Sequence, residues 1–198
     1  MPGMIETLLV VSGYLAGSVS AGILVARVMG LGDPREGGSG NPGATNLLRL
    51  GGRRAALITL LLDALKGVAP VLAGHAAGVG GAWLAAIGLA AFLGHLYPVF
   101  FGFRGGKGIA TGLGVMLAWS LPVGGATLLV WMLAAALFRI SSLAALISFA
   151  LAPVWCLLLA DSPALAIAAG FMALVTAWRH RGNIRRIAAG AEPRIGRS

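Results

Sequence analysis

The chain has 198 residues, of which 58% are hydrophobic and only 11% are charged. An ordinary soluble domain carries about 25% charged residues, so this sequence has too few polar side chains to cover a water-soluble surface. The same apolar content excludes an intrinsically disordered chain. The composition therefore predicts a single all-α, membrane-embedded domain over residues 1–198.

The net charge of +9 would indicate a nucleic-acid partner in a soluble protein. In a membrane protein Lys and Arg instead mark the cytoplasmic side, so we expect no nucleic-acid partner. The 31 glycines show no collagen period, which predicts close helix packing or sites lined by backbone. Cys156 is the single cysteine and lies in an apolar run, so we expect it to be a small buried side chain.

Six apolar runs follow one another along the chain, separated by polar, proline-containing or glycine-rich breaks: residues 5–26, 55–73, 82–96, 109–138, 143–159 and 164–178. The first run has neither a basic region before it nor a cleavage site after it, so it predicts a retained helix and not a signal peptide. Residues 27–52 form the one long polar stretch between the runs, and a basic, polar tail begins at Arg179.

The fourth run is long enough for one tilted helix or for two short helices that separate at Ser120-Leu121-Pro122. Two helices give seven crossings and place every Lys and Arg outside the apolar runs on one side, whereas one helix divides them between the two sides. The positive-inside rule therefore favours about seven transmembrane helices, with the N-terminus outside and the C-terminus cytoplasmic. This arrangement makes the following residues cytoplasmic: Arg27, Arg35, Arg49, Arg53, Arg54, Arg104, Lys107, Arg139, Arg179, Arg181, Arg185, Arg186, Arg194 and Arg197.

Four polar segments then share the cytoplasmic face: residues 35–54, 95–111, 139–142 and 179–192. The first contains the run Gly-Gly-Ser-Gly-Asn-Pro-Gly-Ala-Thr-Asn at 37–46. Its glycine spacing matches a dinucleotide fingerprint, but that motif needs a preceding strand, and none is expected here. Glycines that let backbone N–H groups approach an anion, followed by a helix N-terminus, favour a phosphate site, and the alternative is a flexible loop.

The second segment places Lys107 among three glycines, Gly105, Gly106 and Gly108. It is not a nucleotide-binding P-loop, because Phe101 and Gly108 occupy positions where that motif needs Gly and Ser or Thr. A lysine among glycines at the start of a helix suits a phosphate. The alternative is a basic anchor on the cytoplasmic side of the membrane.

The third and fourth polar segments indicate a ligand site less specifically than the first two. Arg139 to Ser142 can be a charged loop with a serine helix cap. The basic tail can bind anionic lipid, although His180 and Asn183 at i, i+3 would share a helix face. Asp63 and Lys66 have the same spacing inside the second apolar run. Charges at membrane depth are costly, and either a structural ion pair or a role at the site would explain them.

The remaining acidic residues and histidines do not cluster, so we expect no metal ion. Neither a G-x-S-x-G elbow nor a Ser-His-Asp arrangement is evident. The polar segments are rich in Ser, Thr, Asn, Gly, Lys and Arg and poor in acids. Such a site would hold phosphate groups with little acid–base chemistry, which favours a substrate that arrives already activated.

Taken together, the motifs resemble those of the bacterial acyl-phosphate:glycerol-3-phosphate acyltransferases, the PlsY family. The matching segments are S-G-N-P-G-A-T-N at 39–46, G-G-K-G-x-A-T at 105–111, and H-R-G-N-I-x-R at 180–186 with G-x-E at 190–192. D-x-x-K-G at 63–67 and R-x-x-S at 139–142 also match. The resemblance covers nearly the whole chain, including its length and its seven-span layout.

The resemblance implies transfer of an acyl group from acyl phosphate to the 1-hydroxyl of glycerol 3-phosphate, giving lysophosphatidate and inorganic phosphate, the first step of phosphatidate synthesis. It implies no cofactor, no acyl-CoA and no acyl carrier protein, and a site on the cytoplasmic face of the bacterial inner membrane. The residues implied to be catalytic are Ser39, Lys107, His180 and Asn183. Those implied to bind substrate are Gly40, Asn41, Gly43, Ala44, Thr45, Asn46, Arg49, Arg104, Gly106 and Ser142.

Two other functions fit parts of the sequence. An organophosphate or phosphate transporter would explain the helices and the basic face, but the chain lacks the internal repeat common in transporters, and its polar residues crowd one face. A protein that binds anionic lipid through its tail would leave Ser39 to Asn46 unexplained.

Overall fold

The computed structural model describes residues 3–196, so Arg197 of the predicted basic set lies outside the described residues. Within this range every regular element is a helix, as the composition predicts. The elements are α1 (Met4–Gly17), α2 (Ala21–Val28), α3 (Ala44–Ala76), α4 (Gly81–Leu96), the 3₁₀ turn η1 (Val99–Phe101), α5 (Ile109–Trp119), α6 (Leu121–Phe138), α7 (Ser141–Ala160), α8 (Pro163–Arg179) and α9 (Arg181–Ala188).

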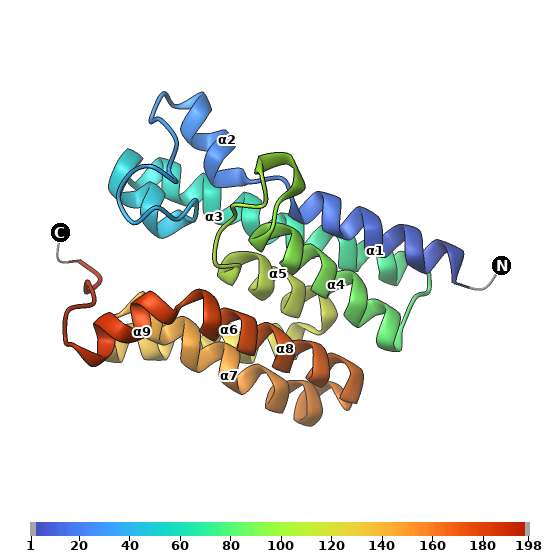
Figure 1. The fold of residues 1–198 in the computed structure, drawn as a ribbon. Helices are drawn as coiled ribbons and strands as arrows, with labels where there is room; N and C mark the ends of the chain where they lie inside the picture. Colours follow the sequence, from blue (N-terminus) through green and yellow to red (C-terminus); the bar gives the residue numbers. More distant parts are fainter. Residues whose placement is uncertain (1–2, 197–198) are drawn as a thin grey trace.

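The long helices lie side by side in two groups (Figure 1). Helices α1, α3 and α4 pack together, α6, α7 and α8 form the second group, and α5 contacts both. The blue start of α1 and the red segment after α9 lie at opposite ends of the molecule. The core between the groups contains Phe92, Val115, Met116, Phe149 and Met172, all of which are buried.

Five regions are long and apolar enough to cross a bilayer: Met4–Val28, Ala44–Ala76, Gly81–Phe101, Leu121–Phe138 and Ser141–Ala160. Helices α5 and α8 are apolar but shorter. Large apolar side chains such as Leu61, Leu133 and Leu158 are exposed on the outer faces of the bundle. An exposed surface of this kind is compatible with lipid and not with water.

The break that the sequence predicts in the run 109–138 is present, because α5 ends at Trp119 and α6 begins at Leu121. Ser120 between them is extended, with φ −160°. Gly124 packs so closely on Leu117 that a Cβ there would overlap the Leu117 backbone. Residues seven apart in one continuous helix lie roughly 10 Å apart along the axis, so this contact means that the chain reverses direction.

One local prediction is wrong, and two polar segments contain helices whose bounds the structure supplies. The first apolar run is not one helix, because Ser18 donates from Oγ to the Tyr14 carbonyl and the chain leaves helical geometry before α2. The polar stretch 27–52 is helical from Ala44, with a break at Gly52, where φ is 73°. In the basic tail, residues 181–188 form α9, which contains Asn183 and begins directly after His180.

Glycines let the helices approach closely, as their number predicts. A Cβ at Gly17 of α1 would overlap the Ala91 carbonyl of α4, and a Cβ at Gly67 of α3 would overlap the Thr111 carbonyl of α5. Small residues at such contacts allow backbones to pack without a gap, which stabilises helix association in membranes. Four non-apolar stretches come together at one end of this bundle: the connections 29–43, 97–108 and 139–140, and the segment after α8.

Candidate active site

The loop that precedes α3 is organised by one buried amide. The Asn46 side chain is fully buried in the first turn of α3, where its Nδ2 donates to the carbonyls of Pro34 and Gly37 at 2.9 and 3.0 Å. Its Oδ1 accepts from the Ser39 N–H at 2.8 Å. Gly38 passes over this amide with φ 60°, and a Cβ there would overlap Asn46 Oδ1. The loop is therefore wound around Asn46, and Ser39 is exposed at its surface.

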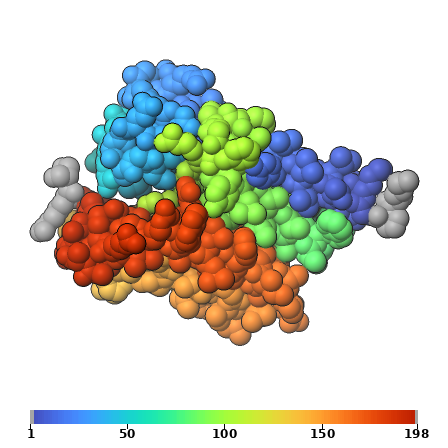
Figure 2. Space-filling view, in the orientation of Figure 1, coloured from blue at the N-terminus to red at the C-terminus, as the bar shows by residue number. Residues whose placement is uncertain are grey.

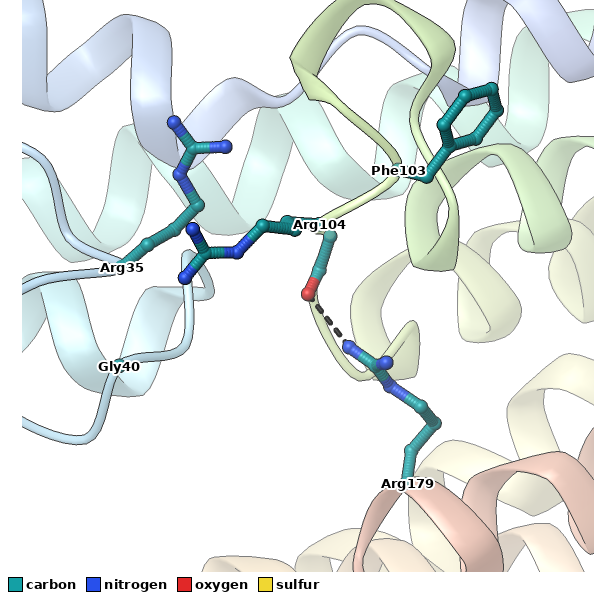
Figure 3. Close-up of a pocket in the computed structure, with 6 residues that line it drawn as sticks. Arg35, Gly40, Phe103, Arg104 and Arg179 are labelled. Carbon is teal, nitrogen blue, oxygen red and sulfur yellow. Dashed lines mark hydrogen bonds between the residues drawn. The ribbon is translucent and has the colours of Figure 1, made fainter.

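The loop before α5 is held between two elements. The N–H groups of Gly105 and Gly106 donate to the carbonyls of Leu96 and His95 at the end of α4, both at 3.2 Å. From the other side, Arg179 Nη2 of α8 donates to the Gly105 and Gly106 carbonyls at 2.7 and 2.9 Å. Figure 3 shows the Arg179 guanidinium meeting this loop. These contacts fix the backbone directly before Lys107.

Hydrogen bonds between polar side chains connect Lys107 to Glu192, in the segment after α9. Lys107 Nζ donates to Asn183 Oδ1 of α9, and Asn183 Nδ2 donates to Glu192 Oε1, both at 2.5 Å. Ser142 Oγ at the start of α7 donates to the same carboxylate oxygen at 2.7 Å. Arg186 Nε donates to Glu192 Oε2 at 2.7 Å. Three of the four predicted polar segments thus meet around one carboxylate.

The tail after α9 is tied back to the loop between α6 and α7. The Ile195 N–H donates to the Arg139 carbonyl at 2.6 Å, and Arg139 Nη2 donates to the Ile195 carbonyl at 3.1 Å. Arg139 ends α6 with φ 57°. This pairing holds Glu192 close to Ser142 and Asn183.

A cavity of about 290 Å³ lies over Lys107. It is lined by Ser39, Lys107, Arg179, Arg181, Gly182, Asn183, Arg185 and Arg186. Figure 2 shows the blue 29–43 loop, the green 97–108 loop and the red C-terminal segment meeting around a hollow. A cavity with this many cations and amide groups is suited to a phosphate group.

A second cavity of about 240 Å³ adjoins the first and shares Arg179 with it. Arg35, Gly40, Arg104 and Gly105 line its remaining walls, together with Phe103. In Figure 3 the Arg104 side chain extends toward Arg35, and Arg179 lies on the opposite side. Two basic cavities side by side can hold two anionic groups at once.

The electrostatics of the site follow from its burial. Burial lowers the pKa of Lys107 to about 8, with the Glu192 carboxylate raising it and the nearby cations Arg186, Arg179 and Arg49 lowering it further. Burial also lowers the pKa of His180 to about 4, and the Lys107 charge acts in the same direction. His180 is therefore neutral at physiological pH. Its Nδ1 must donate to the Thr176 carbonyl, 2.8 Å away, which leaves Nε2 as a hydrogen-bond acceptor.

The structure brings together most of the residues singled out from the sequence. Ser39, Lys107 and Asn183 line the first cavity, and Gly40 and Arg104 line the second. The remainder are placed around these cavities. The charge of Lys107 interacts with those of Arg49 and His180, Ser142 reaches the network through Glu192, and the Gly106 carbonyl accepts from Arg179. Asn41 and Gly43 precede α3, and Ala44 and Thr45 begin it.

Two residues are more central than the sequence analysis assigned. Glu192 stands in the quoted G-x-E segment, but its position at the centre of the network depends on the fold of the tail. Arg179 supports the Lys107 loop through its carbonyls. Its place at the start of the basic tail marks it as a cation of the polar face, but side-chain bonds to backbone carbonyls leave no pattern in a sequence.

Comparison with known proteins assigns the fold and the family. A family model described as glycerol-3-phosphate acyltransferase matches residues 7–190. The glycerol-3-phosphate acyltransferase of Halorhodospira halophila is 55% identical over 98% of this chain and 99% of its own length. That of Methylococcus capsulatus is 54% identical over 97% of both chains. The chain belongs to the glycerol-3-phosphate acyltransferase family.

Solved structures support the same assignment. The crystal structure of PlsY, an integral membrane glycerol 3-phosphate acyltransferase, in its glycerol 3-phosphate form superposes with a TM-score of 0.91 at 38% identity and covers 96% of each chain. The lysophosphatidic acid form gives a TM-score of 0.87 at 37% identity over 96% of this chain and 95% of that one. This acyltransferase is thus an all-helical integral membrane enzyme of phospholipid synthesis, which excludes the transporter interpretation.

Proposed function

We propose that this acyltransferase takes its acyl group from an acyl phosphate and transfers it to the 1-hydroxyl of glycerol 3-phosphate. The observation that carries the proposal is the pair of adjoining basic cavities, because this reaction brings together two substrates that each carry a phosphate. The products are lysophosphatidate and inorganic phosphate. Related PlsY structures are described in a glycerol 3-phosphate form and a lysophosphatidic acid form, which supports the acceptor and the product. Neither acyl-CoA nor acyl carrier protein is needed.

Each substrate has its own set of residues in this proposal. Glycerol 3-phosphate binds in the larger cavity, where Lys107 faces Asn183. The residues that complete its site are Ser39, Arg49, Ser142 and His180. The phosphate of the donor binds in the second cavity, which Gly40 and Arg104 line, and the backbone at 41–45 and Gly106 complete this site in the proposal. Asn46 acts indirectly, because its amide is engaged by the loop itself.

The chemistry requires positioning more than a strong base. The 1-hydroxyl oxygen attacks the acyl carbonyl carbon, the bond from that carbon to the bridging phosphate oxygen breaks, and the electron pair leaves with the phosphate. Holding the two substrates together can lower the barrier by roughly 7–11 kcal/mol. Lys107 and N–H donors stabilise the charge on the carbonyl oxygen and the departing phosphate. The hydroxyl proton passes to a substrate phosphate oxygen. Neutral His180 can accept it instead, or Ser39 can take it while passing its own hydroxyl proton to a phosphate oxygen.

We also propose seven crossings within one domain, with the site on the cytoplasmic face of the bacterial inner membrane. The charge pattern supports this orientation, because the loops that carry Lys and Arg gather at one end of the bundle. The acyl chain then enters between helices from the inner leaflet. Cysteines introduced at Glu36 and at Gly78, in loops at opposite ends of α3, test the orientation. Labelling of position 36 by an impermeant reagent in intact cells would contradict it.

Purified enzyme mixed with palmitoyl phosphate and glycerol 3-phosphate tests the reaction. We expect release of inorganic phosphate only when both compounds are present, together with an equal amount of lysophosphatidate. Glycerol replaces glycerol 3-phosphate in the control, because it has the hydroxyl but lacks the phosphate that Lys107 would bind. Phosphate release that is independent of the acceptor would mean hydrolysis, and would contradict the proposal.

The pKa of Lys107 predicts an alkaline limit to activity. Because this pKa is about 8, the free enzyme loses the ammonium charge as the pH rises through that value. We expect kcat/KM for glycerol 3-phosphate, measured between about pH 6 and pH 10, to fall above a midpoint near that pKa. Arg keeps its charge throughout this range, so K107R moves the fall to higher pH. An unchanged midpoint in K107R would assign the fall to another group.

A further inference from the structure

A group of ionisable side chains lies in the helical core and has no part in the chemistry described above. Asp63 and Lys66 of α3 form an ion pair of 2.8 Å, and their side chains are only 3% and 8% exposed. His95 of α4 is 6% exposed, with Nδ1 3.4 Å from Asp63 Oδ1 and 3.1 Å from Thr111 Oγ1 of α5. Charged groups are costly at such depth, which makes a functional reason for this cluster worth testing.

The cluster reaches the Lys107 loop through His95. The imidazole of His95 fills the space beside Gly106, so that a Cβ at Gly106 would overlap its Nε2. The backbone carbonyl of His95 also accepts from the Gly106 N–H. Gly106 is therefore enclosed by His95 on one side and by Arg179 on the other. Asp63 and Thr111, which both lie against Nδ1, set the orientation of the ring.

Lys66, at the other end of the cluster, supplies a hydrogen-bond donor to a second stretch of non-helical backbone. Lys66 Nζ donates to the Val19 carbonyl at 2.7 Å, in the break between α1 and α2. Gly67, the next residue, allows α3 to pack on the Thr111 carbonyl. The D-x-x-K-G motif thus packs directly against the end of the G-G-K-G-x-A-T motif. Non-helical backbone at membrane depth needs protein partners of this kind.

We infer that Asp63, His95 and Thr111 are positioning residues for acyl transfer, which hold the Gly105–Gly106 backbone so that Lys107 points into the glycerol 3-phosphate cavity. The inference rests on the proposed function of Lys107. Asp63 and Thr111 orient the His95 ring, the ring and its carbonyl fix Gly106, and Lys107 follows directly in the chain. Lys66 balances the Asp63 charge and joins the α1–α2 break to the same unit.

The variant T111V tests this with the least disturbance, because it removes one hydroxyl and no charge. Losing one hydrogen bond should raise KM for glycerol 3-phosphate by about tenfold while leaving KM for palmitoyl phosphate unchanged. D63N should have the same selectivity with a larger effect. H75A is the matched control: His75 also lies on α3 and contacts a carbonyl of the α5 helix, Ala118 O at 3.0 Å, but it is exposed and at the other end. It should leave both KM values unchanged.

A double-mutant cycle with K107M separates positioning from general stability. If the cluster acts through Lys107, T111V should lose its effect on KM for glycerol 3-phosphate once Lys107 is replaced. Three results would each overturn the inference. The effects of T111V and K107M could multiply in the double variant, T111V could change both KM values equally, or T111V could have wild-type kinetics. If K107M itself leaves KM for glycerol 3-phosphate unchanged, the substrate site of the proposed function fails, and the inference fails with it.

Discussion

Replacing Lys107 with Met is expected to lower kcat/KM for glycerol 3-phosphate by about 10²–10³-fold, the range seen when one donor to a developing charge is removed. Met retains the length and flexibility of the side chain, so the loop held by His95 and Arg179 should keep its shape. The lost group is the ammonium, which donates to Asn183 and faces the larger cavity. The measurement is initial rates of phosphate release at varied glycerol 3-phosphate.

K107R serves as the control for Lys107. Arg preserves the cation but presents a planar fork in place of a compact ammonium, so it should retain part of the activity. Arg54 lies outside the site on the exposed side of α3, and R54M should behave as wild type. Activity of K107M within about threefold of wild type would remove Lys107 from the stabilisation of transition-state charge, since one donor is normally worth far more.

Changing Asn46 to Asp is expected to disrupt the 29–43 loop and to abolish most of the activity. The amide donates to two carbonyls, those of Pro34 and Gly37, and a carboxylate at this position can donate to neither. Leaving the buried Pro34 carbonyl unpaired costs about 1–3 kcal/mol, the partly buried Gly37 carbonyl adds a smaller cost, and repulsion between these oxygens and the carboxylate adds to both. Thermal unfolding with and without glycerol 3-phosphate, together with phosphate release, measures both consequences.

E36Q is the control for Asn46 because Glu36 lies on the same loop and is exposed. This substitution also exchanges a carboxylate and an amide, and it should change neither the unfolding temperature nor the rate. An N46D enzyme with normal activity would show that the loop tolerates the loss of its central amide. The donor phosphate would then have to bind independently of the loop conformation seen here.

The architecture of the bundle is predictable because lipid imposes a simple rule on each helix. Long apolar runs mark the helices, and Ser120 with Pro122 marks the reversal between α5 and α6. The positive-inside rule then brings the polar segments to one end, where Lys107 meets Asn183. Composition and charge determine these features within each segment, and no distant contact is needed to predict them.

The features that could not be predicted from the sequence depend on contacts between residues far apart in the chain. The break after Gly17 is stabilised by Ser18 and by Lys66 from another helix, so its own sequence still resembles one continuous helix. The family resemblance implies that Asn46 binds substrate, and the hydrogen bonds of its amide to the loop become visible only in the folded chain. The role of Glu192 depends on partners that lie nine and fifty residues away in the chain.

The position of Glu192 in the chain bears on how the enzyme matures. The carboxylate that joins Ser142 to Asn183 follows α8, so it leaves the ribosome after helices α1 to α8 have been made. The segment around Ile195 docks on Arg139 and so holds Glu192 in place. Before it docks, Asn183 lacks the carboxylate to which its amide donates, and Lys107 donates to that same Asn183. We therefore expect the network from Lys107 to Glu192 to be completed only after α8 has been made, which makes the docking of the tail a late step in assembling the site.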